Sequence, residues 1–367
     1  MLTDHYICKE KSLCFVYHLP TALPYQVSTD IALEACLKNG FENISIIDLY
    51  GVCSLTDRRV TRHEAWDANC VQSLFNVDYA FCGFYQDIAI IVNAMPEPLL
   101  PKKIVNIWHG MPIRTIGFQN PIERQEPSML GLEGHQQRIH HCVQSDFYRD
   151  VFVSAFNTRK EQVHEIGNLR TEVPQKTLPV IIGEQKISKT VLYAPTNGRR
   201  QYDSLSERMG VPYNLLELNN FLLENHILLL VKQHDQELPI PLSSSTNILP
   251  FNEYFSKQGK TSASEVISNI DILITDCSSL AIDAIDFKTP LIMLSPTPEY
   301  LRSNPLLFSE SDLYGSSPKT FDDLCDAICA ATNGKVRGQP NFSRLLDINH
   351  KANRTPSQNL IETIIGL

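Results

Sequence analysis

The chain has 367 residues, of which 43% are hydrophobic and 20% charged, and its formal net charge at pH 7 is −9. This length exceeds one ordinary hydrophobic core, so we expect two domains with the composition of a soluble globular protein. The negative charge argues against a broad basic face for nucleic acid, although it leaves room for a small cluster of arginines that binds phosphate.

The sequence predicts neither a membrane span nor a secretion signal. The longest apolar runs, near 88–94 and 227–231, are far shorter than a bilayer span of roughly 18 residues. The N-terminal sequence MLTDHYICKEK lacks the charged-then-apolar order of a signal peptide. The ten cysteines are scattered, and Cys325 and Cys329, the closest pair, lack a second pair of ligands for zinc. We therefore expect reduced cysteines, no metal, no cofactor and a cytoplasmic location.

Short apolar runs alternate with helical patterns over most of the chain. The predicted strands are 13–17, 44–49, 79–83, 104–108, 140–144, 191–194, 227–232, 247–250, 271–275 and 291–294. The predicted helices are 27–39, 147–156, 213–224, 263–269 and 321–332. This alternation favours parallel sheets with crossover helices, and hence an α/β fold.

The weakest periodicity lies at 168–189, and we place the domain linker there. The first domain would cover residues 1–175 and the second 176–367, with the last helix able to pack back on the first domain. Two such α/β halves are expected to face each other across a cleft. Because ligands of parallel sheets gather at the carboxyl ends of the strands, polar residues at strand ends are the candidate site residues.

The first such strand end is KIVNIWHGMPIRTIG, residues 103–117. His109 directly follows the predicted strand, Gly110 allows close backbone approach, and Pro112 prevents the strand from continuing. A histidine there can act as a general base near neutral pH. The alternative is a loop histidine that only bonds to its neighbours.

Three further segments bring cations to strand ends. In LLLVKQHD, residues 228–235, Lys232 and His234 lie on the same side of a strand and suit a phosphate, unless this is a solvated strand end. In VLYAPTNGRR, residues 191–200, the adjacent arginines match phosphate oxygens but are also typical of surface charge. GNLRTE, residues 167–172, adds Arg170 at a turn.

The last segment is DILITDCSSLAIDAIDFKTP, residues 271–290, in which a buried strand breaks at Asp276. Ser278 and Ser279 precede a helical pattern, and the unpaired donors of a first helical turn bind anions. Asp283 shares a helix face with Ser279 and is placed to accept a hydrogen bond from a substrate hydroxyl. The alternative is an ordinary helix cap.

Taken in order, these segments resemble the motifs of the CDP-glycerol glycerophosphotransferases, which include teichoic-acid primases and polymerases and related capsule polymerases. The resemblance rests on WHGMPIRTIG, SDFYRDVFVSAF, GNLRTE, LYAPTNGRR, LLLVKQHD and NIDILITDCSSLAIDAIDFKTPLI, from about Lys103 to Arg302. It implies a GT-B fold of two Rossmann-like halves, an acceptor-side half and a CDP-donor half. It also implies metal-independent transfer of a polyol phosphate from a CDP-activated donor, with release of CMP.

The resemblance assigns roles to individual residues. His109 would deprotonate the acceptor hydroxyl, and His234 would stabilise the pyrophosphate or the leaving CMP. The donor-binding positions correspond to Gly110, Met111, Pro112, Ile113, Arg170, Pro195, Thr196, Arg199 or Arg200, Lys232, Gln233, Ser278, Ser279 and Asp283.

The chain departs from the family pattern in ways that would alter the polyol or the acceptor. Leu169 and Glu172 replace a proline and an aspartate of the family, and Cys277 replaces a tyrosine. The implied acceptor is a glycan or a lipid-linked molecule at the inner leaflet, with peripheral membrane contact. Two alternatives remain: a GT-B glycosyltransferase that uses a nucleotide sugar, and a non-catalytic nucleotide- or glycan-binding protein.

Overall fold

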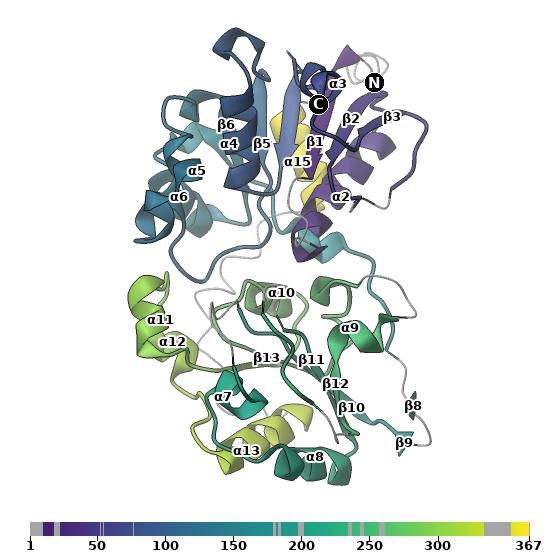
Figure 1. The fold of residues 1–367 in the computed structure, drawn as a ribbon, viewed down its shortest axis with the longest axis vertical. Coiled ribbons are helices and arrows are strands. Elements are labelled where there is room, and N and C mark those ends of the chain that lie inside the picture. Colours follow the sequence, from purple (N-terminus) through teal and green to yellow (C-terminus); the bar gives the residue numbers. More distant parts are fainter. Residues whose placement is uncertain are drawn as a thin grey trace. The chain divides into compact units, whose positions relative to one another are not determined.

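The structure is a computed structural model that describes residues 10–17, 23–51, 53, 55–75, 77–178, 181–182, 185–196, 202–233, 237–242, 246–256, 261–333 and 354–366. These residues form two compact units. Unit 1 contains the described residues up to Met111, then Thr115–Val173 and 354–366, and unit 2 contains Pro112–Arg114 and the described residues from Pro174 to 333. Figure 1 labels helices and strands of both units where there is room.

Unit 1 is built on a seven-stranded sheet of order β3-β2-β1-β4-β5-β6-β7, in which every pairing is parallel. The strands are β1 (Ser12–Tyr17), β2 (Asn43–Asp48), β3 (Val60–His63), β4 (Tyr79–Cys82), β5 (Lys103–Asn106), β6 (Ile139–Val143) and β7 (Val163–Glu165). The order reverses between β1 and β4. This is the strand order of a Rossmann-like sheet.

The helices of unit 1 cover both faces of this sheet. They are α2 (Leu23–Lys38), α3 (Ala68–Ser73), α4 (Tyr85–Ala94), α5 (Pro127–Leu130), α6 (Asp146–Ala155) and α15 (Pro356–Leu360). The 3-10 turns are η1 (Glu97–Leu99), η2 (Gly117–Gln119), η3 (Glu123–Gln125), η4 (Gln136–Arg138), η5 (Lys160–Gln162) and η6 (Leu169–Glu172), and the π-helix η9 (Ile361–Ile365) continues α15.

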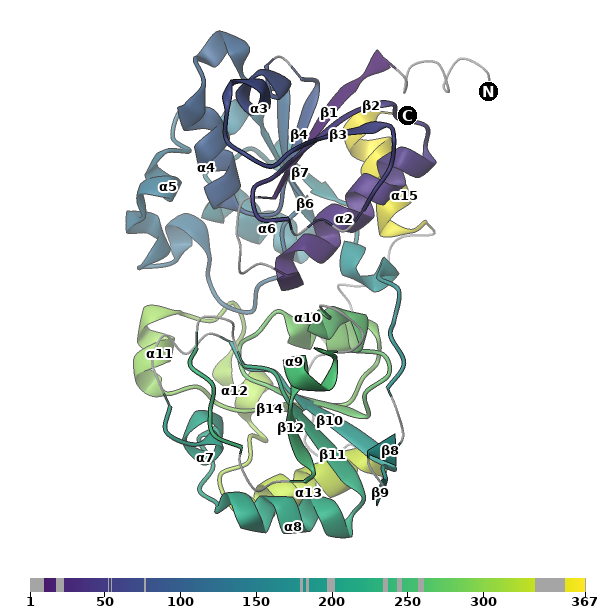
Figure 2. The same cartoon turned by 45° about the vertical axis from the view of Figure 1, so that its right-hand side comes forward.

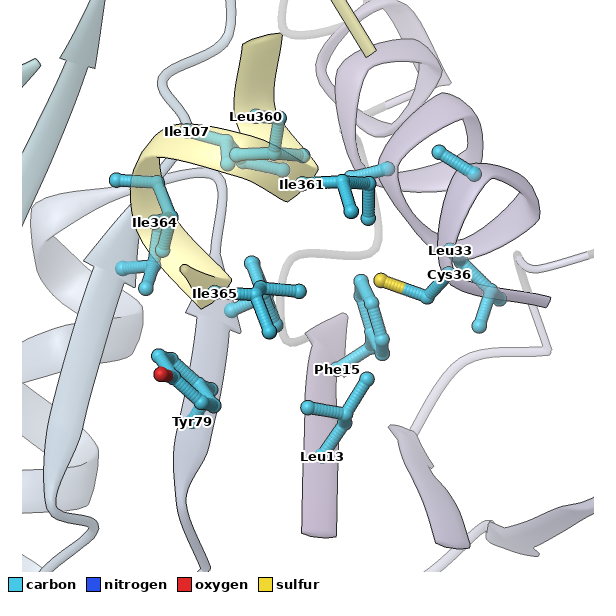
Figure 3. Packing of buried hydrophobic residues seen from close by; sticks show 14 of the residues in the cluster. Leu13, Phe15, Leu33, Cys36, Tyr79, Ile107, Leu360, Ile361, Ile364 and Ile365 are labelled. Atoms are coloured by element: carbon cyan, nitrogen blue, oxygen red, sulfur yellow. The ribbon is translucent and has the colours of Figure 1, made fainter. Parts of the chain in front are cut away.

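The core of unit 1 follows from strands that are apolar at successive positions. Leu13 and Phe15 of β1 point to one face, where Phe15 stacks on Phe81 at 4.7 Å between ring centroids. Leu33 and Cys36 of α2 cover that face (Figure 3). Because parallel strands are buried on both faces, such runs need no polar alternation.

The C-terminal segment completes the same core. Leu360, Ile361, Ile364 and Ile365 are buried with β1 and α2 (Figure 3). Helices α2 and α15 lie side by side in both views (Figures 1 and 2). A capping box at Thr355 begins α15. The end of the chain therefore belongs to unit 1.

Unit 2 has a five-stranded parallel sheet of order β12-β11-β10-β13-β14, with the same reversal between its first and fourth strands. The strands are β10 (Lys189–Tyr193), β11 (Ile227–Val231), β12 (Ile248–Pro250), β13 (Ile272–Thr275) and β14 (Leu291–Met293), and β8 (Ile181–Ile182) pairs with β9 (Gln185–Lys186) in a hairpin. The helices are α7 (Leu205–Met209), α8 (Leu215–Glu224), α9 (Phe251–Tyr254), α10 (Leu280–Asp286), α11 (Pro298–Ser303), α12 (Glu310–Tyr314), α13 (Phe321–Thr332) and the 3-10 turn η8 (Ala263–Glu265).

The core of unit 2 lies between its sheet and the helices α8 and α13. Leu218 and Leu222 of α8 and Leu324 and Ile328 of α13 pack against inward residues of β10, β11, β13 and β14. The predicted helix at 263–269 is wrong in extent, because a capping box between Ser262 and Glu265 closes a single 3-10 turn that is followed by turns. Among the described residues, no helix combines the length and the apolar character needed to cross a bilayer.

Replacing Ile364 by alanine tests the contribution of the C-terminal segment. Ile364 is 3% exposed, so we expect a loss of about 2–5 kcal/mol in the free energy of unfolding of unit 1. The matched control is Thr363→Ala, an exposed neighbour on the same turn, which should cost less than about 0.5 kcal/mol. Urea unfolding measures the loss, and hydrogen exchange assigns it to unit 1. Equal stabilities of the two variants would contradict this account of the core.

Candidate active site

The chain turns sharply where β5 ends, and this turn carries His109. Trp108 has a φ of 54°, a left-handed conformation that a bulky side chain rarely adopts, and Gly110 has a φ of 138°. The Trp108 N–H donates to Oδ1 of Asn106 at 3.2 Å. Its indole ring packs edge-on against Phe152, with centroids 5.2 Å apart. The turn is thus held through both the backbone and the side chain of Trp108.

The imidazole of His109 lies against the end of the neighbouring strand β4. Its Nδ1 is 3.1 Å from the carbonyl oxygen of Gly83, and its ring stacks on Phe84 at 4.2 Å and on Trp108 at 4.7 Å. A carbonyl only accepts, so Nδ1 of the neutral ring carries the proton and Nε2 carries the lone pair. This is the tautomer of a ring that accepts a proton through Nε2.

Arg170 lies beneath this turn. It is 1% exposed, and its Nη1 donates to the carbonyl oxygen of His109 at 2.7 Å. Asn168 begins the 3-10 turn η6 and accepts from the Arg170 N–H at 3.1 Å. We predicted that Arg170 contacts the donor. In the structure its guanidinium is buried and bonds to the histidine backbone, and its contact with the donor stays a prediction.

A buried pair of polar residues, missed by the sequence analysis, supports the turn from the sheet side. Asn106 and His141 are 0% and 1% exposed, and Nδ2 of Asn106 lies 3.1 Å from Nδ1 of His141. Burial lowers the pKa of His141 to about 3, so its ring is neutral and Nδ1 accepts. The asparagine in the buried strand β5 could have indicated this pair, because buried polar side chains need hydrogen-bond partners.

The segment after Gly110 is packed into the protein. Met111, Pro112 and Ile113 are buried, and the carbonyl of Ile113 accepts from the Leu307 N–H at 2.8 Å. The family pattern places donor contacts at these positions, and this assignment stays a prediction. The side chain of Ile113 is 0% exposed.

In unit 2 the polar strand ends meet where the strand order reverses. Oδ1 of Asp276 accepts from the Thr196 N–H at 2.8 Å, and the Thr275 hydroxyl donates to the Ala194 carbonyl at 2.6 Å. The Cys277 thiol is 3.6 Å from the Thr196 hydroxyl. The predicted residues Pro195 and Thr196 after β10 are therefore joined to the break after β13.

Arg208 of α7, also missed by the sequence analysis, neutralises this edge. Its side chain is 5% exposed, lies 3.6 Å from Asp276 and 3.3 Å from Glu237, and donates to the Thr196 carbonyl. The guanidinium stacks over the Tyr202 ring at 4.7 Å. Burial raises the pKa of Asp276, and Arg208 opposes that rise. The available sequence signal was an arginine in the short helical segment LSERM.

Lys232 and Gln233 follow β11 and differ in their surroundings. The ammonium of Lys232 lies 6.0 Å from the centre of the Phe251 ring. The Gln233 amide instead bonds to the Leu238 carbonyl at 3.0 Å and to the Ile240 N–H at 2.8 Å, and its role as a donor contact stays a prediction. The predicted residues Arg199, Arg200 and His234 lie outside the described residues.

The two serines and Asp283 separate in the structure. Ser278 and Ser279 are half-buried before α10, and the Ser278 hydroxyl accepts weakly from the Leu280 N–H at 3.4 Å. Asp283 is 0% exposed and accepts from the Ser264 hydroxyl at 3.2 Å. The carboxylate therefore lies in the interior of unit 2, and its bond to a substrate hydroxyl stays a prediction. Across the described part of the chain, no group of three or more His, Cys, Asp or Glu side chains could hold a metal ion.

With this geometry in view, comparison with known proteins identifies the family. The family model of CDP-glycerol:poly(glycerophosphate) glycerophosphotransferase matches residues 90–353. The chain belongs to this family. Two curated relatives are the teichoic acid ribitol-phosphate polymerase TarK of Staphylococcus aureus, 23% identical over 75% of this chain, and the teichoic acid poly(glycerol phosphate) polymerase of Bacillus spizizenii, 25% identical over 63%. These matches span 54% and 62% of the relatives' own lengths.

Solved structures show the fold of this glycerophosphotransferase family member. The wall teichoic acid polymerase TagF matches with a TM-score of 0.66 and 16% identity over 99% of this chain and 90% of that chain. A UDP-N-acetylglucosamine 2-epimerase from Listeria monocytogenes matches with a TM-score of 0.55 and 9% identity, over 96% of both chains. The predicted α/β fold of GT-B type is confirmed.

Two departures from the family pattern have structural partners. Leu169 is 3% exposed and belongs to the core of unit 1. The Glu172 carboxylate accepts from both the backbone N–H and the hydroxyl of Ser357, each at 2.6 Å. In this glycerophosphotransferase family member, both residues attach η6 to the C-terminal segment.

The buried state of His141 predicts a pH-dependent stability. An unfolded histidine binds a proton below a pKa of about 6.5, whereas folded His141 stays neutral down to about 3. Between these values the unfolded state binds more protons, so stability rises with pH and is lost as the pH falls. As the pH falls below 6.5, His141→Gln should therefore lose less unfolding free energy than the wild type, by up to about 1.4 kcal/mol per pH unit.

Urea unfolding of both proteins at pH 5, 6 and 7.5 measures the effect. The comparison at pH 7.5 is the internal control, because both side chains are then neutral. Parallel stability curves for the two proteins would show that His141 does not titrate in this way.

Proposed function

We propose that this chain transfers glycerol phosphate, or a related polyol phosphate, from a CDP-activated donor to a hydroxyl of a glycan or lipid-linked acceptor and releases CMP. The observation that carries the proposal is the constellation around His109, whose Nδ1 is engaged by Gly83 at 3.1 Å within a chain of this family. The named activities of the curated relatives and a TagF variant soaked with CDPG support the choice of donor.

In the proposed reaction, Nε2 of His109 accepts the proton of the acceptor hydroxyl as its oxygen attacks the phosphorus that bears the polyol. The bond from that phosphorus to the bridging oxygen of the diphosphate breaks, and this oxygen leaves with CMP. The product is a phosphodiester between acceptor and polyol. Phosphoryl transfer depends mainly on positioning and charge stabilisation, which favours a base held in one orientation.

For the donor we propose the polar groups at the carboxyl edge of the unit 2 sheet. Thr196, Lys232, Ser278 and Ser279 follow β10, β11 and β13, and ligands of such sheets bind beside the point where the strand order reverses. Lys232 would supply positive charge for the diphosphate and the serines hydroxyl groups. His234 as the second histidine, and Arg199 or Arg200 as phosphate ligands, remain predictions from the family pattern.

We further propose that a lipid-linked acceptor brings the protein to the inner face of the membrane as a peripheral protein. The support is chemical, because an acceptor with a lipid anchor stays at the bilayer. Co-sedimentation with acceptor-loaded vesicles, compared with acceptor-free vesicles of the same lipids, measures this contact.

A donor screen tests the reaction. The protein is incubated with CDP-glycerol, CDP-ribitol, UDP-sugars and GDP-sugars, each with a polyol-phosphate primer as acceptor, and nucleotide products are separated by chromatography. We expect CMP from at least one CDP-polyol. Release of UDP or GDP would favour a glycosyltransferase instead, and turnover of none would favour a binding protein.

Replacement of His109 tests the general base. We expect His109→Ala to lower kcat by at least about 10²-fold with little change in the KM of the donor, because a base acts in the transition state. The matched control is His135→Ala in the same unit. Nδ1 of His135 lies 3.3 Å from Oε2 of Glu97. Similar kcat values for the two variants would exclude His109 as the base.

A further inference from the structure

We propose that Arg170 is a positioning residue for His109, which it holds through the backbone carbonyl without contacting the donor. This inference rests on the proposed function and deepens it, because it explains how the base keeps its orientation. It also replaces the donor-binding role that the family pattern implies for this arginine.

The bond itself is of a strong type. The Arg170 guanidinium is buried, and its Nη1 lies 2.7 Å from the His109 carbonyl oxygen, the length of a charge-assisted hydrogen bond. A buried cation is tolerated only where acceptors surround it, so this contact cannot be exchanged for water without cost. The bond fixes the peptide plane between His109 and Gly110.

The turn needs this support because its conformation is unfavourable by itself. A tryptophan with a φ of 54° persists only where its surroundings determine the backbone from several sides. Asn106 holds the Trp108 N–H at 3.2 Å, Gly83 holds the imidazole Nδ1 at 3.1 Å, and Arg170 holds the carbonyl. Without one of these three bonds, the His109 imidazole can adopt more than one orientation.

Arg170 is in turn placed by the segment around it. Gly167 has a φ of 94°, and a Cβ added there would lie 3.0 Å from Pro356, so a larger residue would strain the entry into η6 and displace Pro356. Glu172, at the end of η6, is tied to Ser357. The C-terminal segment thus braces the turn from which Arg170 reaches the histidine.

The experiment compares Arg170→Ala, Arg170→Lys and the matched control Arg149→Ala, an arginine of α6 that pairs with Glu165 at 3.4 Å. We expect Arg170→Ala to lower kcat about 10²-fold with the donor KM within about threefold, since misplacement of a base by about 1 Å has an effect of this size. Arg170→Lys should retain more activity, added guanidinium at millimolar concentration should partly restore Arg170→Ala, and Arg149→Ala should behave as wild type.

A second readout does not depend on turnover. Long-range 1H–15N spectra of labelled histidine, assigned with His109→Gln, report the tautomer of His109 in the wild type and in the folded Arg170 variants. We expect a single Nδ1–H tautomer in the wild type and a mixed population without the arginine. An unchanged His109 signal in Arg170→Lys and Arg170→Ala would overturn the proposal, as would a rise in donor KM of about tenfold or more at unchanged kcat.

The two proposals fail separately. If the wild type turns over no CDP-polyol, the proposed reaction is wrong, and the histidine spectra still decide whether Arg170 positions His109. If Arg170→Ala does not fold, the kcat, KM and spectra of Arg170→Lys decide the question, because lysine keeps the charge and loses the planar donor.

Discussion

Burial of parallel strands on both faces is the constraint on which the rest of this structure depends. A strand such as β5 or β13 has no solvent-facing side, so polar chemistry can appear only where the strand ends. Parallel pairing then brings the carboxyl ends of neighbouring strands to one edge. This is why His109, after β5, can bond to Gly83, after β4, although 26 residues separate them. Asn106 at the end of β5 and His141 in the middle of β6 are buried polar exceptions; they bond to each other, and Asn106 also accepts from the Trp108 N–H.

The sequence predicted the fold well where this constraint applies. The apolar runs of β1, β10, β11 and β13 indicate strands that are buried on both faces, and the structure has strands there. It failed at the sheet margins, because VTRH of β3 and VHE of β7 are short, polar and only partly buried. Periodicity cannot distinguish such edge strands from loops. We had allowed for a last helix that packs back on the first domain, and in the structure long-range packing against α2 places α15 in unit 1.

For the candidate site, residue type and spacing located the strand ends but not the partners of the side chains. Arg170, Gln233 and Asp283 have the chemistry to bind a donor, yet each bonds to groups inside its own unit. Arg170 and Gln233 share one reason, whereas Asp283 accepts from the side-chain hydroxyl of Ser264. Sharp turns at strand ends leave backbone carbonyls and N–H groups without ladder partners, and a nearby polar side chain satisfies them. A motif therefore marks a place in the fold more reliably than it marks a contact with a ligand.

The same reasoning explains why the acidic edge of unit 2 remains compatible with an anionic ligand. Asp276 would repel a diphosphate if its charge faced outward. Its Oδ1 accepts from the Thr196 N–H at 2.8 Å, and its Oδ2 lies 3.6 Å from Arg208, so the carboxylate is directed into the protein. Arg208 also pairs with Glu237 at 3.3 Å. Thr196, Ser278 and the Lys232 ammonium then provide the polar groups at this edge. Both units thus use a buried arginine to organise a turn, Arg170 through the His109 carbonyl and Arg208 through the Thr196 carbonyl.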